Sequence, residues 1–108
     1  MAEIRYGNAY IIFALYHCSI VTSIAKIWYN TPMKITKPGH CALVLEQEGM
    51  KILTDPGSFT IEQNKSVQGV DVVLITHEHG DHFHVPSIHE VLKNNPKAVV
   101  VCNSAVAK

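Results

Sequence analysis

Seven consecutive residues hold three histidines and an aspartate, in the order Thr76-His77-Glu78-His79-Gly80-Asp81-His82. Neutral imidazole and carboxylate are ordinary ligands of Zn²⁺ and similar divalent ions. His77 and His79 are two positions apart, and residues i and i+2 of an extended segment point to the same side. Both imidazoles can therefore reach one metal ion.

The second part of this stretch offers another pair of ligands. Gly80 permits a turn that a residue with a Cβ atom resists, and the turn can bring Asp81 and His82 back toward the same cavity. Two ligand pairs offset by a turn suit two metal ions a few ångströms apart. A histidine-rich tract without such a role is typical of polar, low-complexity regions, whereas this one follows an apolar run. The stretch therefore predicts a metal-ligand loop.

The residues around the loop predict the elements that position it. The run 70–75 is apolar except for Asp71 and rich in β-branched residues, which predicts a strand buried on both faces. Ligand sites in open α/β sheets favour the carboxyl ends of strands. Pro86 suits the first turn of a helix over 86–93, and a further apolar run predicts a strand over 97–102. Strand, helix and strand in this order predict a βαβ unit.

Upstream of the loop, three short apolar runs alternate with turn signals, which predicts a β-meander. The expected strands are residues 34–36, 41–46 and 50–54. His40 lies in the first turn and Asp55 at the end of the third strand. Taken alone, each residue type is common in turns and needs no function.

These motifs resemble those of a known family. The loop after a hydrophobic strand resembles the signature of the metallo-β-lactamase superfamily. The segments 33–36, 39–46 and 51–57 are similar to the opening of its UlaG-like branch of small metal-dependent hydrolases, and the resemblance covers roughly residues 33–103. It implies an α/β fold, namely the N-terminal half of a four-layer αββα sandwich whose second half would supply further metal ligands.

The resemblance also implies roles for the loop residues. His77 and His79 would bind a first metal ion. Asp81 and His82 would bind a second, with Asp81 also acting as the catalytic residue that orients water. The cofactors would be two divalent ions, zinc in the first place, with manganese or iron as alternatives.

In the same family, the two turn residues approach the metal loop. His40 is expected to contact substrate or a ligand, and Asp55 to orient a metal-bound histidine through a hydrogen bond. Bound metal ions lower the pKa of water, so the expected reaction is hydrolysis of an ester, lactone, amide or phosphodiester. The alternative is a truncated, catalytically inactive fragment that at most binds metal weakly.

Residues 1–32 differ from the rest of the chain, because 9–28 is largely apolar. About 20 apolar residues can span a bilayer, so a membrane helix is one interpretation. A signal peptide with a loose cleavage site at Ser23-Ile24-Ala25 is another. A third is an upstream extension before a natural start at Met33, which we favour. A buried helix fits least, because the apolar residues go nearly all round. We expect a family domain over 33–108.

The charge balance and the cysteine content indicate which binding partners and which compartment to expect. Nine Lys and Arg residues balance nine Asp and Glu residues, which argues against a dedicated nucleic-acid surface. The three cysteines, Cys18, Cys41 and Cys102, suggest no disulfide framework and favour a reducing compartment. We expect a cytoplasmic protein with a small-molecule substrate, anchored or exported only if residues 1–32 are a genuine leader. An exposed sheet face would favour an oligomer.

Overall fold

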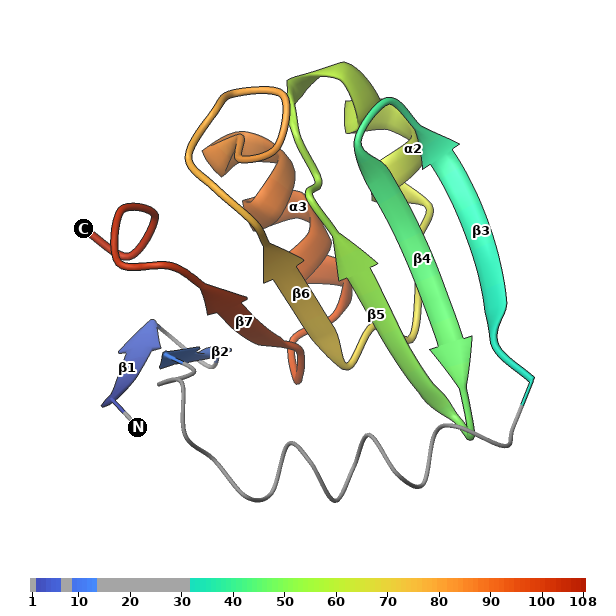
Figure 1. The fold of residues 1–108 in the computed structure, drawn as a ribbon, viewed down its shortest axis with the longest axis horizontal. Coiled ribbons are helices and arrows are strands. Elements are labelled where there is room, and N and C mark those ends of the chain that lie inside the picture. Colours follow the sequence, from blue (N-terminus) through green and yellow to red (C-terminus); the bar gives the residue numbers. More distant parts are fainter. Residues whose placement is uncertain (1, 7–8, 14–31) are drawn as a thin grey trace.

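The computed structural model describes residues 2–6, 9–13 and 32–108. Among these residues, seven strands form one mixed sheet in the order β1-β2-β7-β6-β5-β4-β3 (Figure 1). The strands are β1 Ala2–Tyr6, β2 Ala9–Phe13, β3 Lys34–Gly39, β4 Ala42–Gln47, β5 Met50–Thr54, β6 Val72–Ile75 and β7 Val99–Cys102. The helices are the 3₁₀ helix η1 Ser58–Thr60 and the α-helices α2 Ile61–Lys65 and α3 Val85–Asn94.

The predicted β-meander is confirmed by β3, β4 and β5, which pair antiparallel in chain order. Glu48 and Gly49 connect β4 to β5 with φ angles of +49° and +81°. Positive φ at both central residues is the conformation that a two-residue hairpin turn requires. β3 runs on through Pro38 to Gly39, beyond its predicted end, with a shift of register after Thr36.

The predicted strand–helix–strand unit is also present. β6 and β7 are parallel neighbours joined through α3. Pro86 lies in the first turn of α3, and Ile88 and Val91 are buried on its inner side. β6 in turn pairs parallel with β5. The carboxyl ends of β5 and β6 therefore lie next to each other at the same end of the sheet's strands.

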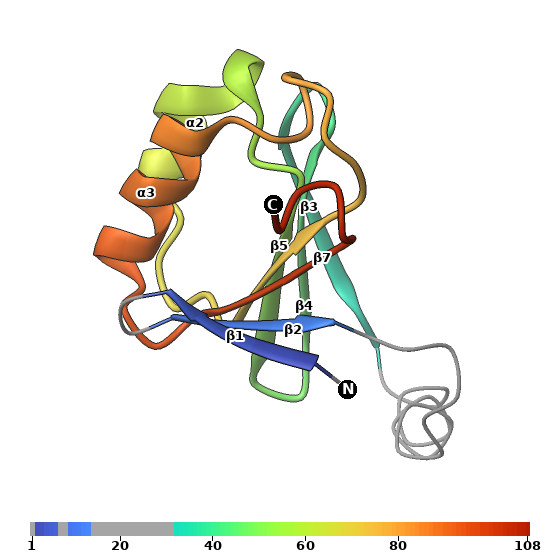
Figure 2. The same cartoon turned by 90° about the vertical axis from the view of Figure 1, so that its left-hand side faces the viewer.

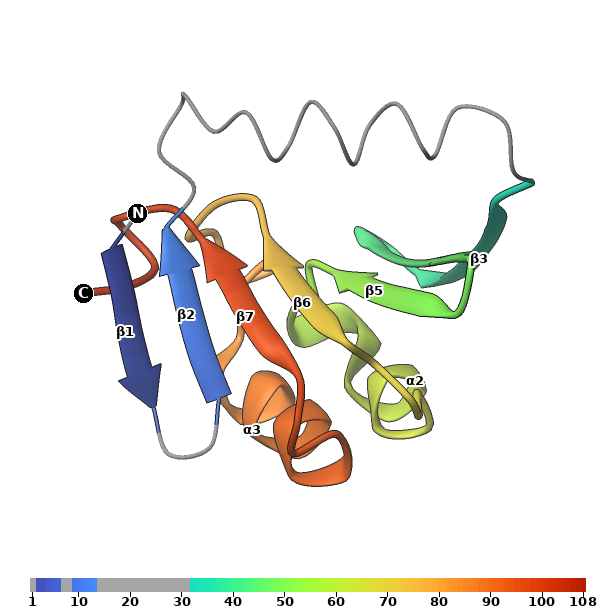
Figure 3. The same ribbon diagram turned by 90° about the horizontal axis from the view of Figure 1, so that it is seen from below.

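The core lies on one face of the sheet, where α2 and α3 pack (Figure 2). Side chains in register across four strands are buried there: Val44, Leu53, Val73 and Val100. The prediction that the 70–75 strand is buried on both faces is wrong, because Val72 and Leu74 are only partly buried. The opposite face carries Leu45, Ile52, Val72 and Val99 in register, each only partly buried, and the helices that the structure describes cover only the other side (Figure 3).

The start of the chain supplies one edge strand of the sheet, on the side away from β3. β1 and β2 pair antiparallel, and β2 lies parallel to β7, with Ile11 opposite Val100. The division of the chain at residue 33 stays a prediction. Residues 14–31, with most of the apolar segment and the candidate cleavage site, lie outside the described residues. No described helix is both long and apolar enough to cross a membrane.

Candidate metal centre

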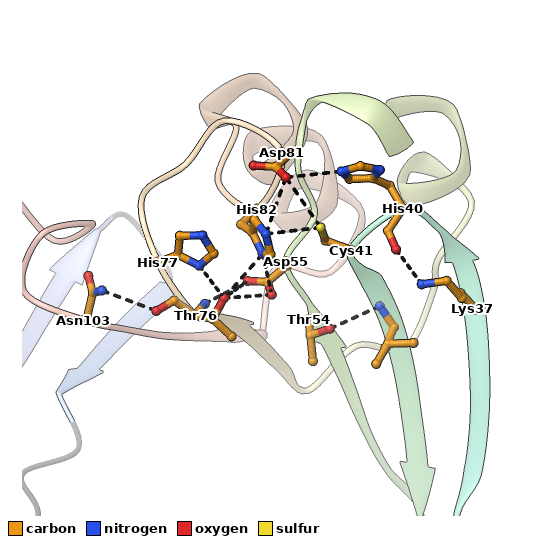
Figure 4. Close-up of polar contacts among 11 residues, drawn as sticks. Lys37, His40, Cys41, Thr54, Asp55, Thr76, His77, Asp81, His82 and Asn103 are labelled. Carbon is orange, nitrogen blue, oxygen red and sulfur yellow. Dashed lines mark hydrogen bonds and ion pairs between the residues drawn. The ribbon is translucent and has the colours of Figure 1, made fainter.

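Three connections meet beyond the carboxyl ends of β5 and β6 (Figure 4). They are the turn between β3 and β4, the exit from β5, and the loop 76–82 that follows β6. β5 and β6 are parallel, so both deliver their carboxyl ends here, while the antiparallel β4 delivers its first residues. The topology thus brings His40, Asp55 and the histidine loop together.

Hydrogen bonds close the histidine loop. The backbone N–H groups of His82 and Phe83 both donate to the carbonyl of His79, at 2.9 and 2.7 Å. The N–H of Ser58 donates to the carbonyl of Gly80 at 2.9 Å, which ties the loop to the β5 exit. Gly80 itself has no positive φ, and a Cβ atom added to it would meet no atom within 4 Å. The prediction that this turn needs a glycine is therefore wrong, because the turn uses ordinary φ angles.

The glycine that the loop requires is Gly57. A Cβ atom added there would lie 1.8 Å from the backbone oxygen of Asp81 and 2.1 Å from its carbonyl carbon. Real Cβ atoms do not approach backbone so closely, so the absence of a side chain at Gly57 sets how near the loop lies to β5. Glycine is the residue that permits such close approach of two backbones.

Asp55, which directly follows β5, holds the first residue of the loop through hydrogen bonds. Its carboxylate is buried, 6% exposed as a residue, at a φ of +44° that aspartate tolerates better than most residues. It accepts hydrogen bonds from the backbone N–H of Thr76 at 2.8 Å and from the Thr76 hydroxyl at 2.9 Å. Its Oδ2 also lies 3.1 Å from Nδ1 of His82.

These contacts determine which ring nitrogens are free. An ionised carboxylate only accepts hydrogen bonds, so a neutral His82 carries its hydrogen on Nδ1 and keeps a lone pair on Nε2. The single Thr76 hydroxyl hydrogen goes to Asp55. The Thr76 oxygen then accepts from Nδ1 of His77 at 2.9 Å, which leaves Nε2 of His77 free. We infer that Asp55 and Thr76 together prepare both rings to bind through Nε2.

The three loop imidazoles are neighbours. The ring centroids of His77 and His82 are 3.9 Å apart, and those of His77 and His79 are 4.7 Å apart with the rings edge to face. His77 and His82 are partly buried and His79 is exposed. The cluster can therefore be reached from solvent on the His79 side.

Asp81 links this cluster to the β3–β4 turn. Its Oδ2 lies 3.5 Å from Nε2 of His82 and 3.2 Å from Nε2 of His40. The hydrogen bond from His40 holds the pKa of Asp81 below its ordinary value, so the carboxyl is ionised at neutral pH. His40 adopts a φ of +40°, so the turn that presents its ring is locally strained.

Cys41 completes the group. Its Sγ lies 3.2 Å from Nε2 of His82 and 3.7 Å from Oδ2 of Asp81. Loss of solvent and the negative charge of Asp81 both raise the pKa of the Cys41 thiol, so without a bound cation it is protonated at neutral pH. The thiol can then donate to His82 or Asp81.

The structure brings all six sequence-predicted residues into one connected cluster: His40, Asp55, His77, His79, Asp81 and His82. Their metal-binding and catalytic roles stay predictions. Sequence reasoning missed Cys41 and Thr76 as members of the site. Cys41 directly follows His40, and Thr76 opens the histidine stretch, so adjacency to assigned residues was the available signal.

Comparison with known proteins identifies the family of the chain. The family model described as beta-lactamase superfamily domain matches residues 34–107. A protein of Mycobacterium tuberculosis is 33% identical over 75 residues, which are 69% of this chain and 35% of the relative. A UPF0173 metal-dependent hydrolase of Geobacillus thermodenitrificans is 41% identical over 71 residues, 63% of this chain and 30% of the relative.

A solved structure shares the fold. The crystal structure of a proposed metal-dependent hydrolase from Parabacteroides distasonis covers 72% of this chain and 36% of its own, with a TM-score of 0.60 and 28% sequence identity. The chain therefore belongs to the beta-lactamase superfamily, which confirms the predicted family and the α/β fold. It spans about a third of the length of the curated relatives it matches, 35% and 30% for the two named here.

Proposed function

We propose that this protein is a metal-dependent hydrolase and that its histidine loop holds the metal. One observation carries the proposal: Nδ1 of His82 and Nδ1 of His77 both bond to the Asp55–Thr76 pair, at 3.1 and 2.9 Å. Histidines that bind metal almost always donate their other ring N–H to a carboxylate or a similar acceptor. Relatives named as metal-dependent hydrolases support the same class of protein.

The donor set fits a divalent cation. Zinc prefers the ligand types found here: two adjacent imidazoles whose Nδ1 atoms are held by Asp55 and Thr76, a third imidazole whose ring centroid lies 4.7 Å from that of His77, and an ionised carboxylate. His77, His79, Asp81 and His82 would hold the ions, and the two ligand pairs suit two of them. Manganese and iron accept the same groups. When bound, such ions would lower the pKa of water and polarise the substrate.

The remaining residues would orient substrate and water. The ionised Asp81 carboxylate is 33% exposed at its side chain, so it can accept a hydrogen bond from water and orient that water toward the reacting group. The ring of His40 lies 4.7 Å from that of Phe59, which is 69% exposed. This pair offers a polar and an apolar contact to a small molecule, an ester, lactone, amide or phosphodiester. The cytoplasm is the proposed location.

A second candidate function is metal binding without turnover. The observation behind it is the donor set itself, because the imidazoles and the carboxylate of the loop can hold a metal ion whether or not a substrate is turned over. In that case the chain would take up metal but would not hydrolyse substrate. Both candidates share the same ligands and differ only in whether the site can turn over substrate.

The test measures both properties on the same samples. The 108-residue chain is loaded with Zn²⁺ or Mn²⁺ and assayed on an activated ester, a lactone and a phosphodiester. His77→Ala/His79→Ala is the metal-site variant, and His89→Ala, an exposed histidine on α3, is the control. Turnover that needs metal and is lost only in the double variant supports the hydrolase. Metal uptake without turnover selects the second candidate, and absence of both refutes the proposal.

A further inference from the structure

Cys41 lies at the corner of the site where two assigned ligands converge. Its sulfur is 3.2 Å from Nε2 of His82 and 3.7 Å from Oδ2 of Asp81, and those two atoms are 3.5 Å apart. The three donors therefore form a nearly equilateral triangle. The residues come from two connections that are far apart in the chain, the β3–β4 turn and the loop after β6 (Figure 4).

These spacings match those around a tetrahedral ion. Zinc binds sulfur at about 2.3 Å and nitrogen or oxygen at about 2.0–2.2 Å, so two of its ligands are roughly 3.3–3.6 Å apart. All three observed distances lie close to this range. A thiol has one hydrogen to donate, so a hydrogen bond alone would require only His82 or Asp81 near the Cys41 sulfur, and not both.

The nitrogen that faces Cys41 is also the one left free by Asp55. Because Oδ2 of Asp55 occupies Nδ1 of His82, the Nε2 lone pair points to the triangle. Asp81 is steadied on its other side by His40 at 3.2 Å. Each of the three donors is thus held in place by its own chain element or partner.

We propose that Cys41 is a metal ligand, and that its thiolate, Nε2 of His82 and Oδ2 of Asp81 bind one divalent ion. The inference rests on the proposed function, because it extends the ligand set of the same site. On binding, the sulfur would bond to the ion and the thiol proton would pass to solvent. Three protein ligands and one open position are the arrangement of catalytic zinc sites.

A sulfur ligand also selects among metals. Thiolate is a soft ligand that favours zinc, cadmium and cobalt, whereas manganese and magnesium favour oxygen. The chain should therefore prefer zinc over manganese by a margin that depends on Cys41. Cys41→Ser keeps the size of the side chain and replaces the sulfur with oxygen, so it isolates this effect.

The test uses Co²⁺ and the 108-residue chain, with Cys41→Ser and Cys41→Ala as variants. Cys102→Ala is the matched control, because Cys102 on β7 is 8% exposed and belongs to the hydrophobic core. Cys18→Ala controls for the remaining cysteine. We expect a thiolate-to-cobalt charge-transfer band in the near ultraviolet that both Cys41 variants lose and both controls keep. Zinc affinity should fall roughly tenfold or more in Cys41→Ala, at least the effect that loss of an outer partner produces, while manganese affinity changes little.

The outcomes separate this inference from the proposed function. Cobalt bound by the unmodified chain without a thiolate band overturns the role of Cys41 and leaves the histidine ligands standing. A band that persists in Cys41→Ala assigns it to another cysteine and also overturns the role. Failure of the unmodified chain to bind any metal overturns both. If Cys41→Ala fails to fold, as circular dichroism would show, Cys41→Ser and the band of the unmodified chain decide the question.

Discussion

Oδ2 of Asp55 lies 3.1 Å from Nδ1 of His82, although 27 positions separate the two residues in the chain. The contact exists because β5 and β6 are parallel neighbours that end at the same edge of the sheet. A buried carboxylate thereby fixes an imidazole in the loop that follows the next strand. The relationship makes the pairing of two neighbouring strands part of the candidate metal centre.

Replacing this carboxylate should weaken metal binding. Asp55→Asn keeps the shape and tolerates the positive φ, but it puts a neutral amide beside His82 Nδ1 and lowers the basicity of that ring. We expect zinc affinity to fall by roughly 10–100-fold, the usual effect of removing such a partner. Competition with a chromophoric chelator measures it. Asp71→Asn is the control, because Asp71 accepts from the Lys51 N–H at the opposite end of β6. Equal affinities in both variants contradict the role of Asp55.

One glycine in the site should resist substitution by alanine and another should tolerate it. Gly57→Ala places a Cβ atom 1.8 Å from the Asp81 oxygen, so the loop must move. We expect a loss of about 1–3 kcal/mol in the free energy of unfolding, typical of overpacking, and weaker metal binding. Gly80→Ala meets no atom within 4 Å and should leave both properties nearly unchanged. Urea denaturation and metal titration measure the effects. A Gly80→Ala variant that loses more than Gly57→Ala shows that the loop geometry is misassigned.

Glu46 should make stability depend on pH. It lies across from Lys34 on β3 and Lys51 on β5, at 3.1 Å from each ammonium, and both lysines hold its pKa below the ordinary value. A lowered carboxyl pKa stabilises the fold above the unfolded pKa of about 4.3. The contribution disappears as the pH falls through the folded pKa.

Glu46→Gln tests this dependence. The chain should be more stable than the variant near neutral pH, and the difference should shrink to nothing in acid. Thermal unfolding across the acid range measures it, with Glu48→Gln in the exposed hairpin turn as the control. A difference that stays constant with pH contradicts the assigned ion pairs.

The strands and the helix could be predicted because local signals define them. Turn residues end β4 and β5 within a residue of the predicted positions, and Pro86 marks the start of α3. The burial of β6 could not be predicted in the same way. Its apolar residues alternate between a face under the helices and a face that no described helix covers, and the sequence of the strand is alike on both.

The candidate site was predictable where its residues adjoin in sequence, or where the family resemblance supplied them, as for His40 and Asp55, and not where it depends on register alone. The candidate ligand loop is one continuous motif, so its residue types suffice to propose it. The approach of Gly57 to Asp81 and the 3.7 Å contact of Cys41 with Asp81 join different connections. Both depend on how β4 and β6 flank β5, which is a property of the folded sheet.

The most direct measurement is the metal content of the purified chain after dialysis against Zn²⁺, compared with His77→Ala/His79→Ala and with the exposed-histidine control His89→Ala. If the histidine loop binds metal, the unmodified chain and the control retain zinc in equal amounts, and the double variant retains clearly less, because the ligand pair assigned to the first ion is gone while Asp81 and His82 remain. Equal zinc in all three proteins would falsify the assignment of the loop, and with it the proposed hydrolase.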